Sequence, residues 1–273
     1  MAIETFARPP MPRFRAVSYN IHRCIGMDGR KDPGRVAEVI RELGADIVGL
    51  QEVESKRGED GGIEPIQEMA KASGFHLIPG VTVFRDDEDY GNVLLTGRRV
   101  REIRRLDLSF PGREPRGAID VDLDLEGRSI RVLVTHLGLR PRERRVQVRN
   151  LLDVLMMVPD RLTIVMGDIN EWLPGSRTLR WLHRRLGRSP APRTFPALFP
   201  LLSLDRIWVW PRRALLSIRA HDSPTARIAS DHLPLSADIA ALPLVADRMP
   251  VLEEPPGLSS GITQGQSDQG SSL

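Results

Sequence analysis

The chain has few of the residues that would tie its fold to disulfides or to a membrane. Its 273 residues include one cysteine, Cys24, so no internal disulfide can form and nothing requires an oxidising compartment. Cys24 could serve as a nucleophile, but no basic partner stands out for it, and we expect a packed thiol. No apolar run reaches the roughly 18–20 residues of a membrane span. The N-terminal residues 1–15 lack the apolar stretch of a secretory signal, so we expect a cytoplasmic protein. We also expect it to be a monomer.

Lysine is also scarce, because the 39 basic residues comprise 36 arginines and three lysines. The formal net charge of +3 suits an anionic substrate without requiring one. Arginine clusters at 98–101, 104–105 and 142–149 could follow a phosphate backbone, and they could equally be solvated faces of strands and helices.

Composition divides the chain into one domain with two loose ends. Hydrophobic residues make up 41% of the chain, which is enough for the core of a single large α/β domain over residues 13–245. Residues 1–12 carry three prolines, and we expect them to be loosely held. The segment 246–273 is rich in Pro, Gly, Ser and Gln and lacks the apolar content that would offset its ordering entropy, so we expect a disordered tail.

Strands and helices alternate irregularly along the domain. The patterns predict helices at about 33–43, 64–73, 142–157 and 176–187, the first capped by Asp32 and ended by Gly44. They predict strands at about 15–19, 46–50, 75–78, 81–84, 92–96, 102–108, 118–125, 130–135, 162–166, 204–210, 214–220 and 234–240. This order is not a simple βαβ repeat. It favours two mixed sheets packed face to face, with helices on the outer faces.

Polar residues follow apolar runs at five places where a strand is expected to pass into a loop. One such exit means little, since loops carry polar residues and Asp and Asn form turns readily. Five exits whose side chains all suit one reaction indicate a functional site. The residues are Asn20, Glu52, His136, Asp168 with Asn170, and Asp231 with His232.

Metal-assisted hydrolysis of a phosphoester requires residues of these types. Mg²⁺ prefers carboxylate and amide oxygens, so Glu52 is the best candidate for the principal ligand, with Asn20 and Asp231 close by. The metal would polarise the phosphoryl oxygen and neutralise charge that develops in the transition state.

Hydrolysis also needs an aligned and deprotonated water and donors to the phosphate. His232 is our candidate for the base, and Asp205 is the carboxylate expected to orient it. His136 and Asn170 could each donate to a non-bridging phosphate oxygen.

Seven segments of the chain resemble, in order, those of the endonuclease/exonuclease/phosphatase superfamily, which has the DNase I-like fold. Each is weak alone, but together they span residues 18–234. They are Ser18-Tyr19-Asn20-Ile21, Leu50-Gln51-Glu52-Val53, Tyr90-Gly91-Asn92-Val93-Leu94-Leu95-Thr96, Thr135-His136-Leu137, Gly167-Asp168-Ile169-Asn170, Leu204-Asp205-Arg206-Ile207 and Ser230-Asp231-His232-Leu233-Pro234.

The resemblance implies a four-layer α/β sandwich with the site at one end of its two sheets. It implies Mg²⁺ or Mn²⁺ at Glu52, and a role for Asp168 around the attacking water. The match is best with the small bacterial metal-dependent hydrolases of the superfamily. The histidine of Thr135-His136-Leu137 argues against the abasic-site endonuclease branch.

The sequence does not decide between several classes of substrate. We expect a phosphodiesterase or endonuclease acting on nucleic acid. The alternative is a phosphatase or phospholipase-type hydrolase of phospholipid head groups or inositol phosphates, and a catalytically inactive binding module is less favoured. Trp172 lies two residues after Asn170, in the loop that is expected to follow the predicted site, and could stack on a base or a sugar. The residues expected to contact substrate are Tyr90, Asn92, Trp172 and Arg206.

Overall fold

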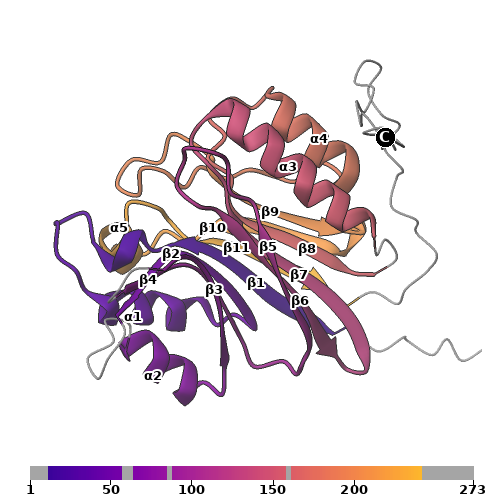
Figure 1. Cartoon of the computed structure of the whole chain (residues 1–273). Coiled ribbons are helices and arrows are strands. Elements are labelled where there is room, and N and C mark those ends of the chain that lie inside the picture. Colours follow the sequence, from indigo (N-terminus) through magenta and orange to yellow (C-terminus); the bar gives the residue numbers. More distant parts are fainter. Residues whose placement is uncertain (1–11, 57–63, 85–87, 158–160, 242–273) are drawn as a thin grey trace, which may run out of the picture.

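The computed structural model describes residues 12–56, 64–84, 88–157 and 161–241. Within them two mixed β-sheets pack face to face and helices cover both outer faces, which confirms the predicted four-layer sandwich (Figure 1). The loose N-terminal segment and the disordered tail expected from the sequence lie outside the described residues, except for Pro12. The boundary expected at residue 245 also lies outside them.

The two sheets have six and five strands. The order of the first is β10 (Leu215–Ala220), β11 (Leu235–Ala240), β1 (Arg13–Asn20), β2 (Ile47–Lys56), β4 (Glu88–Thr96) and β3 (His76–Phe84). The order of the second is β5 (Val100–Asp107), β6 (Gly117–Leu125), β7 (Arg128–His136), β8 (Thr163–Asp168) and β9 (Asp205–Trp210). Within each sheet one central pair is parallel, β1 with β2 and β7 with β8.

The helices form the outer layers. On the outer face of the first sheet lie α1 (Pro33–Leu43), α2 (Glu64–Ala72) and the short α5 (Pro224–Ala229). On the outer face of the second lie α3 (Pro141–Met156) and α4 (Arg177–Leu186). Single 3₁₀ turns occupy His22–Cys24 and Arg212–Ala214. As expected, Asp32 caps α1, since its carboxylate accepts from the amide of Arg35 at 3.0 Å, and Gly44 ends the helix in the left-handed conformation.

Alternation along the strands explains the three separate cores. In β7, Val134 packs between the two sheets while its neighbour Leu133 packs against α3 and α4. In β1, Ala16 faces the central core and Val17 faces the helical layer with α1. Because both faces of the central strands are covered, these strands contain continuous buried apolar stretches, such as residues 132–134 of β7 and 164–166 of β8.

The secondary structure differs from the predictions at β3 and α5. The strands expected at 75–78 and 81–84 are one strand, β3, which runs through Pro79 and Gly80. β3 lies at the edge of its sheet, where a proline is tolerated. Gly80 is required there because a Cβ would lie 2.3 Å from Ile119 on the opposite sheet. The six-residue helix α5 was not predicted, since it is too short to show helical periodicity.

A buried ion pair joins the second sheet to α3. Asp120 is fully buried and accepts bonds of 2.8 and 2.6 Å from Arg131, whose guanidinium also donates to the Val154 carbonyl of α3. Arg104 adds two more bonds to the same carboxylate. Burial alone would raise the pKa of Asp120, but the two arginines hold it below its usual value.

Asp120→Asn is expected to destabilise the fold by about 3–5 kcal/mol, because it leaves the Arg131 guanidinium buried without its counter-charge. Urea unfolding at neutral pH measures this. Asp124→Asn removes the carboxylate of a more exposed pair with Arg101 and should have a much smaller effect. Since the pKa of Asp120 is depressed, its stabilising contribution should be present at neutral pH and lost as the pH falls through that value. Equal unfolding midpoints for the two variants would contradict this account.

Candidate active site

The sheet topology brings the predicted site residues to one end of the sandwich. β1 ends at Asn20, β7 at His136 and β8 at Asp168. β9 runs antiparallel to β8, so its first residue, Asp205, lies directly opposite Asp168. β11 runs antiparallel to β1, which places the loop before it, with His232, beside the end of β1. Residues separated by up to 212 positions therefore meet where the two sheets face each other.

Glu52 reaches the site from a bulge and not from the end of a strand. The sequence predicted a strand at 46–50 that delivers Glu52 into a loop, but β2 continues to Lys56. Two residues of β2, Gln51 and Glu52, oppose the single residue Asn92 of β4, and Glu52 has a φ of 57°. Such a bulge re-aims a side chain. Asn20 then donates from Nδ2 to Oε1 of Glu52 at 3.0 Å and to Oδ2 of Asp168 at 3.1 Å.

Asp168 lies at the centre of this arrangement. The preceding Gly167 is needed because a Cβ there would lie 1.8 Å from the Thr135 carbonyl of β7. Oδ1 of Asp168 accepts from the amide of Asn170 at 2.8 Å, and Oδ2 lies 3.6 Å from Nε2 of His136 and 3.7 Å from Nε2 of His232. Burial, together with the charge of Asp205, raises the pKa of Asp168 to about 6, although His232 acts to lower it.

His232 and Asp205 form a buried dyad. Nδ1 of His232 lies 2.8 Å from Oδ2 of Asp205, and that oxygen also accepts from the Thr194 hydroxyl at 2.6 Å. The ring of Phe195 packs against the imidazole at a centroid distance of 4.9 Å. Burial alone would lower the pKa of His232, but Asp205 and the neighbouring carboxylates raise it to about 10. With Nδ1 bound to Asp205, Nε2 is the nitrogen that faces the site.

The loop that carries His232 differs from the expected one. It follows helix α5 and not a strand, and β11 begins only at Leu235. Ser230 holds this loop against the end of β1, since its hydroxyl donates to the Asn20 carbonyl at 2.7 Å. The amide of His232 in turn donates to the Ser230 hydroxyl at 3.2 Å. The imidazole is therefore held by Ser230 through its backbone amide and by Asp205 through Nδ1.

A second group of nitrogen-bearing side chains lies beside Asp168. Asn170 has a φ of 53°, and its Nδ2 lies 2.9 Å from the Leu137 carbonyl and 3.0 Å from Nε2 of His136. Arg116 places Nη1 3.0 Å from Nδ1 of the same ring. Burial, Arg116 and His232 hold the pKa of His136 well below its usual value, so this imidazole is neutral.

Sequence reasoning missed Arg116. It directly precedes β6 and is one arginine among 36, so no spacing or motif distinguishes it. Its side chain is 8% exposed and pairs with Glu114 at 3.2 Å, while its Nε has no hydrogen-bond partner among the residues that the structure describes. A buried guanidinium with an unused N–H beside His136 is suited to an anionic ligand.

Sequence reasoning also missed the ion pair between Arg144 and Glu171. Both side chains are 4% exposed, and their two contacts measure 3.2 and 3.3 Å. Arg144 donates in addition to the carbonyls of Gly138 and Leu139, in the loop that follows His136. Because Glu171 directly follows Asn170, one arginine of α3 connects the loops after β7 and β8.

Arg144→Ala is expected to lower both stability and hydrolysis, since it leaves the Glu171 carboxylate buried and frees the loops that hold His136 and Asn170. The loss of stability should be about 3–5 kcal/mol. The double variant Arg144→Met/Glu171→Leu removes both charges and should recover much of the stability but not the activity. Thermal unfolding and kinetics on bis(4-nitrophenyl) phosphate measure the two effects. Full activity in the double variant would mean that the pair does not position the loops.

The other predicted residues lie around this centre or apart from it. Asp231 is partly exposed at the rim, where Oδ1 lies 3.8 Å from Nδ1 of His22. Tyr90 and Asn92 line a small cavity with Glu52, Arg116 and His136, and Asn92 donates to the Gly117 carbonyl at 3.1 Å.

Two of the expected substrate contacts are not brought into the centre. Arg206 follows Asp205 in β9, so its side chain lies on the opposite face of the sheet, largely buried, where it donates to the Ser203 carbonyl. Trp172 is 59% exposed and lies in the loop after Asn170.

The oxygen-rich part of the site fits a hard divalent cation. Glu52 and Asp168 are joined through Asn20, and the raised pKa of Asp168 reflects a buried carboxylate whose charge a cation would stabilise. The amide oxygen of Asn20 accepts from the amide of His22 at 3.0 Å, so its nitrogen faces the carboxylates. Among the described residues, Asp168, Asp205 and His232 also place potential ligand atoms within 4.8 Å of one another.

A two-sheet sandwich with this acidic and histidine-containing end is the architecture of the DNase I-like hydrolases. The chain belongs to the endonuclease/exonuclease/phosphatase family, whose model matches residues 17–232. It is 30% identical over 254 residues to the uncharacterized protein YbhP of Escherichia coli K12, covering 83% of this chain and 96% of YbhP.

Solved structures share the fold. An endonuclease/exonuclease/phosphatase from Beutenbergia cavernae superposes with a TM-score of 0.66 at 22% identity, covering 84% of this chain and 71% of that one. The human Nocturnin catalytic domain with bound sulfate gives a TM-score of 0.63 at 22% identity, covering 84% and 93%.

Membership of this family indicates a phosphoester hydrolase. In the part of the chain that the structure describes, no helix is both long and apolar enough to cross a membrane.

Proposed function

We propose that this protein is a Mg²⁺-dependent phosphodiesterase that hydrolyses nucleic acid, with Mn²⁺ as a second usable ion. The observation that carries the proposal is the geometry around Asp168. On one side stands a histidine–aspartate dyad, His232 with Asp205, and on the other the linked pair Glu52 and Asn20. This combination can deprotonate a water beside a bound phosphate.

The dyad is assigned to the water. Asp205 holds His232 in the tautomer with Nδ1 protonated, so Nε2 can take a proton from a water between the imidazole and Asp168. Asp168 orients that water, and its own carboxylate is fixed by the Asn170 amide. When bound at Glu52, with Asn20 and Asp231 nearby, the cation would polarise the phosphoryl oxygen and offset the negative charge that raises the pKa of His232.

The second group of residues is assigned to the phosphate. His136, Asn170 and Arg116 offer N–H groups in a buried environment, where hydrogen bonds to a developing oxyanion are strongest. The bound sulfate in the human Nocturnin catalytic domain supports the idea that this fold accepts a tetrahedral anion.

Nucleic acid is favoured over other phosphodiesters by the surroundings of the site. The exposed Trp172 lies in the same loop as Asn170, and the basic residues are almost entirely arginine, which binds phosphate in a bidentate manner. One observation favours a second candidate, hydrolysis of phospholipid head groups. Large apolar side chains are exposed on the loops that also carry site residues: Leu139, Leu173, Phe199 and Leu201 are each at least 65% exposed.

A substrate panel separates the candidates. The wild-type protein is incubated with supercoiled plasmid, single-stranded oligonucleotide, phospholipid vesicles and inositol phosphates, each with Mg²⁺ and with EDTA. Glu52→Gln serves as the blank for contaminating nucleases. We expect nicking of DNA that requires the metal and disappears in the variant. Turnover of a lipid or an inositol phosphate without any nicking would overturn the assignment to nucleic acid. The cytoplasmic location and the monomeric state remain predictions of the sequence.

A further inference from the structure

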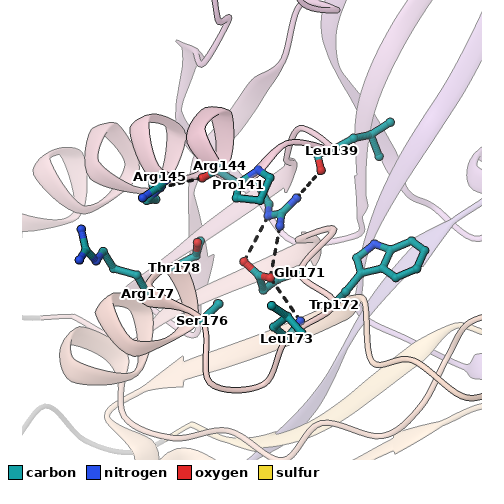
Figure 2. Close-up of a pocket in the computed structure, with 10 residues that line it drawn as sticks. All are labelled: Leu139, Pro141, Arg144, Arg145, Glu171, Trp172, Leu173, Ser176, Arg177 and Thr178. Carbon is teal, nitrogen blue, oxygen red and sulfur yellow. Dashed lines mark hydrogen bonds and ion pairs between the residues drawn. The ribbon is translucent and has the colours of Figure 1, made fainter.

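A cavity of about 440 Å³ lies next to the proposed active site, between the first turns of α3 and α4 (Figure 2). Its volume falls in the range of ~300–1,000 Å³ that is usual for ligand pockets. Two of the loops that line it also carry site residues, since Leu139 follows His136 by three positions and Trp172 follows Asn170 by two. These two loops therefore connect the cavity with the residues proposed to bind the phosphate.

The two ends of the cavity differ in chemistry. Figure 2 shows Arg145 and Arg177 at one end and Trp172 with Leu139 at the other. Arg145 donates to the Pro141 carbonyl through Nε at 3.0 Å, and neither arginine forms an ion pair with a residue in the described part of the chain. Both cationic groups are therefore available to an anion.

The floor between these ends carries no net charge. It is formed by Glu171 and Arg144, the buried pair that connects the two site loops. Because Arg144 neutralises Glu171, the floor does not repel a phosphate held at the arginines.

We propose that this cavity is a subsite for the nucleotide next to the scissile phosphate, with its base stacked on Trp172 and its phosphate between Arg145 and Arg177. The inference rests on the proposed activity toward nucleic acid and extends it to a defined contact. Stacking on an aromatic ring is tolerant of sequence, because every base has a π face. The subsite therefore predicts a preference for chain length and not for a base sequence.

The test compares two substrates that differ in whether they can reach the cavity. Bis(4-nitrophenyl) phosphate reports on the catalytic centre, and a fluorescein-labelled oligothymidylate reports on both regions. Trp172→Ala is expected to raise the oligonucleotide KM about 10-fold relative to the KM for the small diester. Trp172→Phe keeps an aromatic ring and should have an oligonucleotide KM close to that of the wild type. The Kd of the labelled oligonucleotide should rise by the same factor in Trp172→Ala. Fluorescence anisotropy with EDTA present measures this Kd.

Salt dependence tests the two arginines. The double variant Arg145→Ala/Arg177→Ala loses one phosphate contact. The slope of log Kd against log salt concentration should therefore be smaller by about 0.7 than in the wild type. Arg41→Ala is the control, because it changes an exposed arginine of α1 in the opposite helical layer. It should change neither the KM for either substrate nor the salt dependence of the Kd.

The outcomes are distinguishable. If wild-type protein cleaves the oligonucleotide and Trp172→Ala affects both substrates equally, the subsite is wrong and the proposed function stands. If wild-type protein cleaves the small diester but neither binds nor cleaves the oligonucleotide, both proposals fail. If Trp172→Ala instead impairs hydrolysis of vesicles of phosphatidylcholine and phosphatidylglycerol, the cavity serves a lipid and the nucleotide assignment is overturned.

Discussion

Replacing His232 by alanine is expected to lower kcat for a phosphodiester by about 10²–10⁴-fold, the usual contribution of a positioned general base. The physical reason is the dyad, in which Asp205 at 2.8 Å fixes the imidazole so that Nε2 faces Asp168. In the wild type, kcat should rise with pH as His232 loses its proton, because the neighbouring carboxylates raise its pKa. The variant should lack this rise. Initial rates on bis(4-nitrophenyl) phosphate across the pH range measure both effects.

His232→Gln is the matched control for folding. Alanine leaves the Asp205 carboxylate buried with Thr194 as its remaining side-chain partner, so His232→Ala can also lower stability. Glutamine can still donate to Asp205 but is not a base at neutral pH. We expect His232→Gln to unfold closer to the wild type in urea and to show the same loss of kcat. Wild-type kcat in the glutamine variant would remove His232 from the proposed mechanism.

Glu52→Gln is expected to lower activity at least about 10²-fold at a fixed Mg²⁺ concentration. Loss of groups that only support a metal ligand typically costs about 10–100-fold in metal affinity or activity, and a direct ligand should cost no less. The substitution keeps the shape of the side chain in its left-handed bulge and removes one negative charge next to Asn20. Raising the Mg²⁺ or Mn²⁺ concentration should restore part of the rate, and a titration of rate against metal measures this.

Glu54→Gln provides the comparison. Glu54 lies two residues further along β2 and pairs with Lys31 at 2.8 Å. The same chemical change at Glu54 should leave both the rate and its dependence on metal near the wild-type values. If Glu52→Gln and Glu54→Gln behave alike, Glu52 is not the principal ligand.

Much of the fold could be predicted because strand and helix periodicities are local. The α1 cap at Asp32, the end of α1 at Gly44 and the strand that leads into His136 all follow from residues adjacent in sequence. The errors arose where tertiary context overrides a local signal. Pro79 and Gly80 look like a break, yet an edge position and a close approach to Ile119 keep them in an extended strand.

The site also has a part that the sequence predicts and a part that it does not. The residue types and the order of Asn20, Glu52, His136, Asp168 and His232 indicated phosphoester chemistry before any geometry was known. Their convergence depends on strand order, which places β8 beside both β7 and β9. The bulge at Glu52 depends on the pairing between β2 and β4, and no local sequence pattern predicts it.

By itself, the sequence determined the class of fold, the alternating burial of the strands and the kinds of side chain available for catalysis, because these depend on neighbouring residues and on side-chain chemistry. Only the tertiary structure decided which of 36 arginines matter. Arg116 contacts His136 across 20 positions, and Arg144 contacts Glu171 across 27. Such contacts are set by the packing of separate strands and helices, and one-dimensional spacing does not encode them.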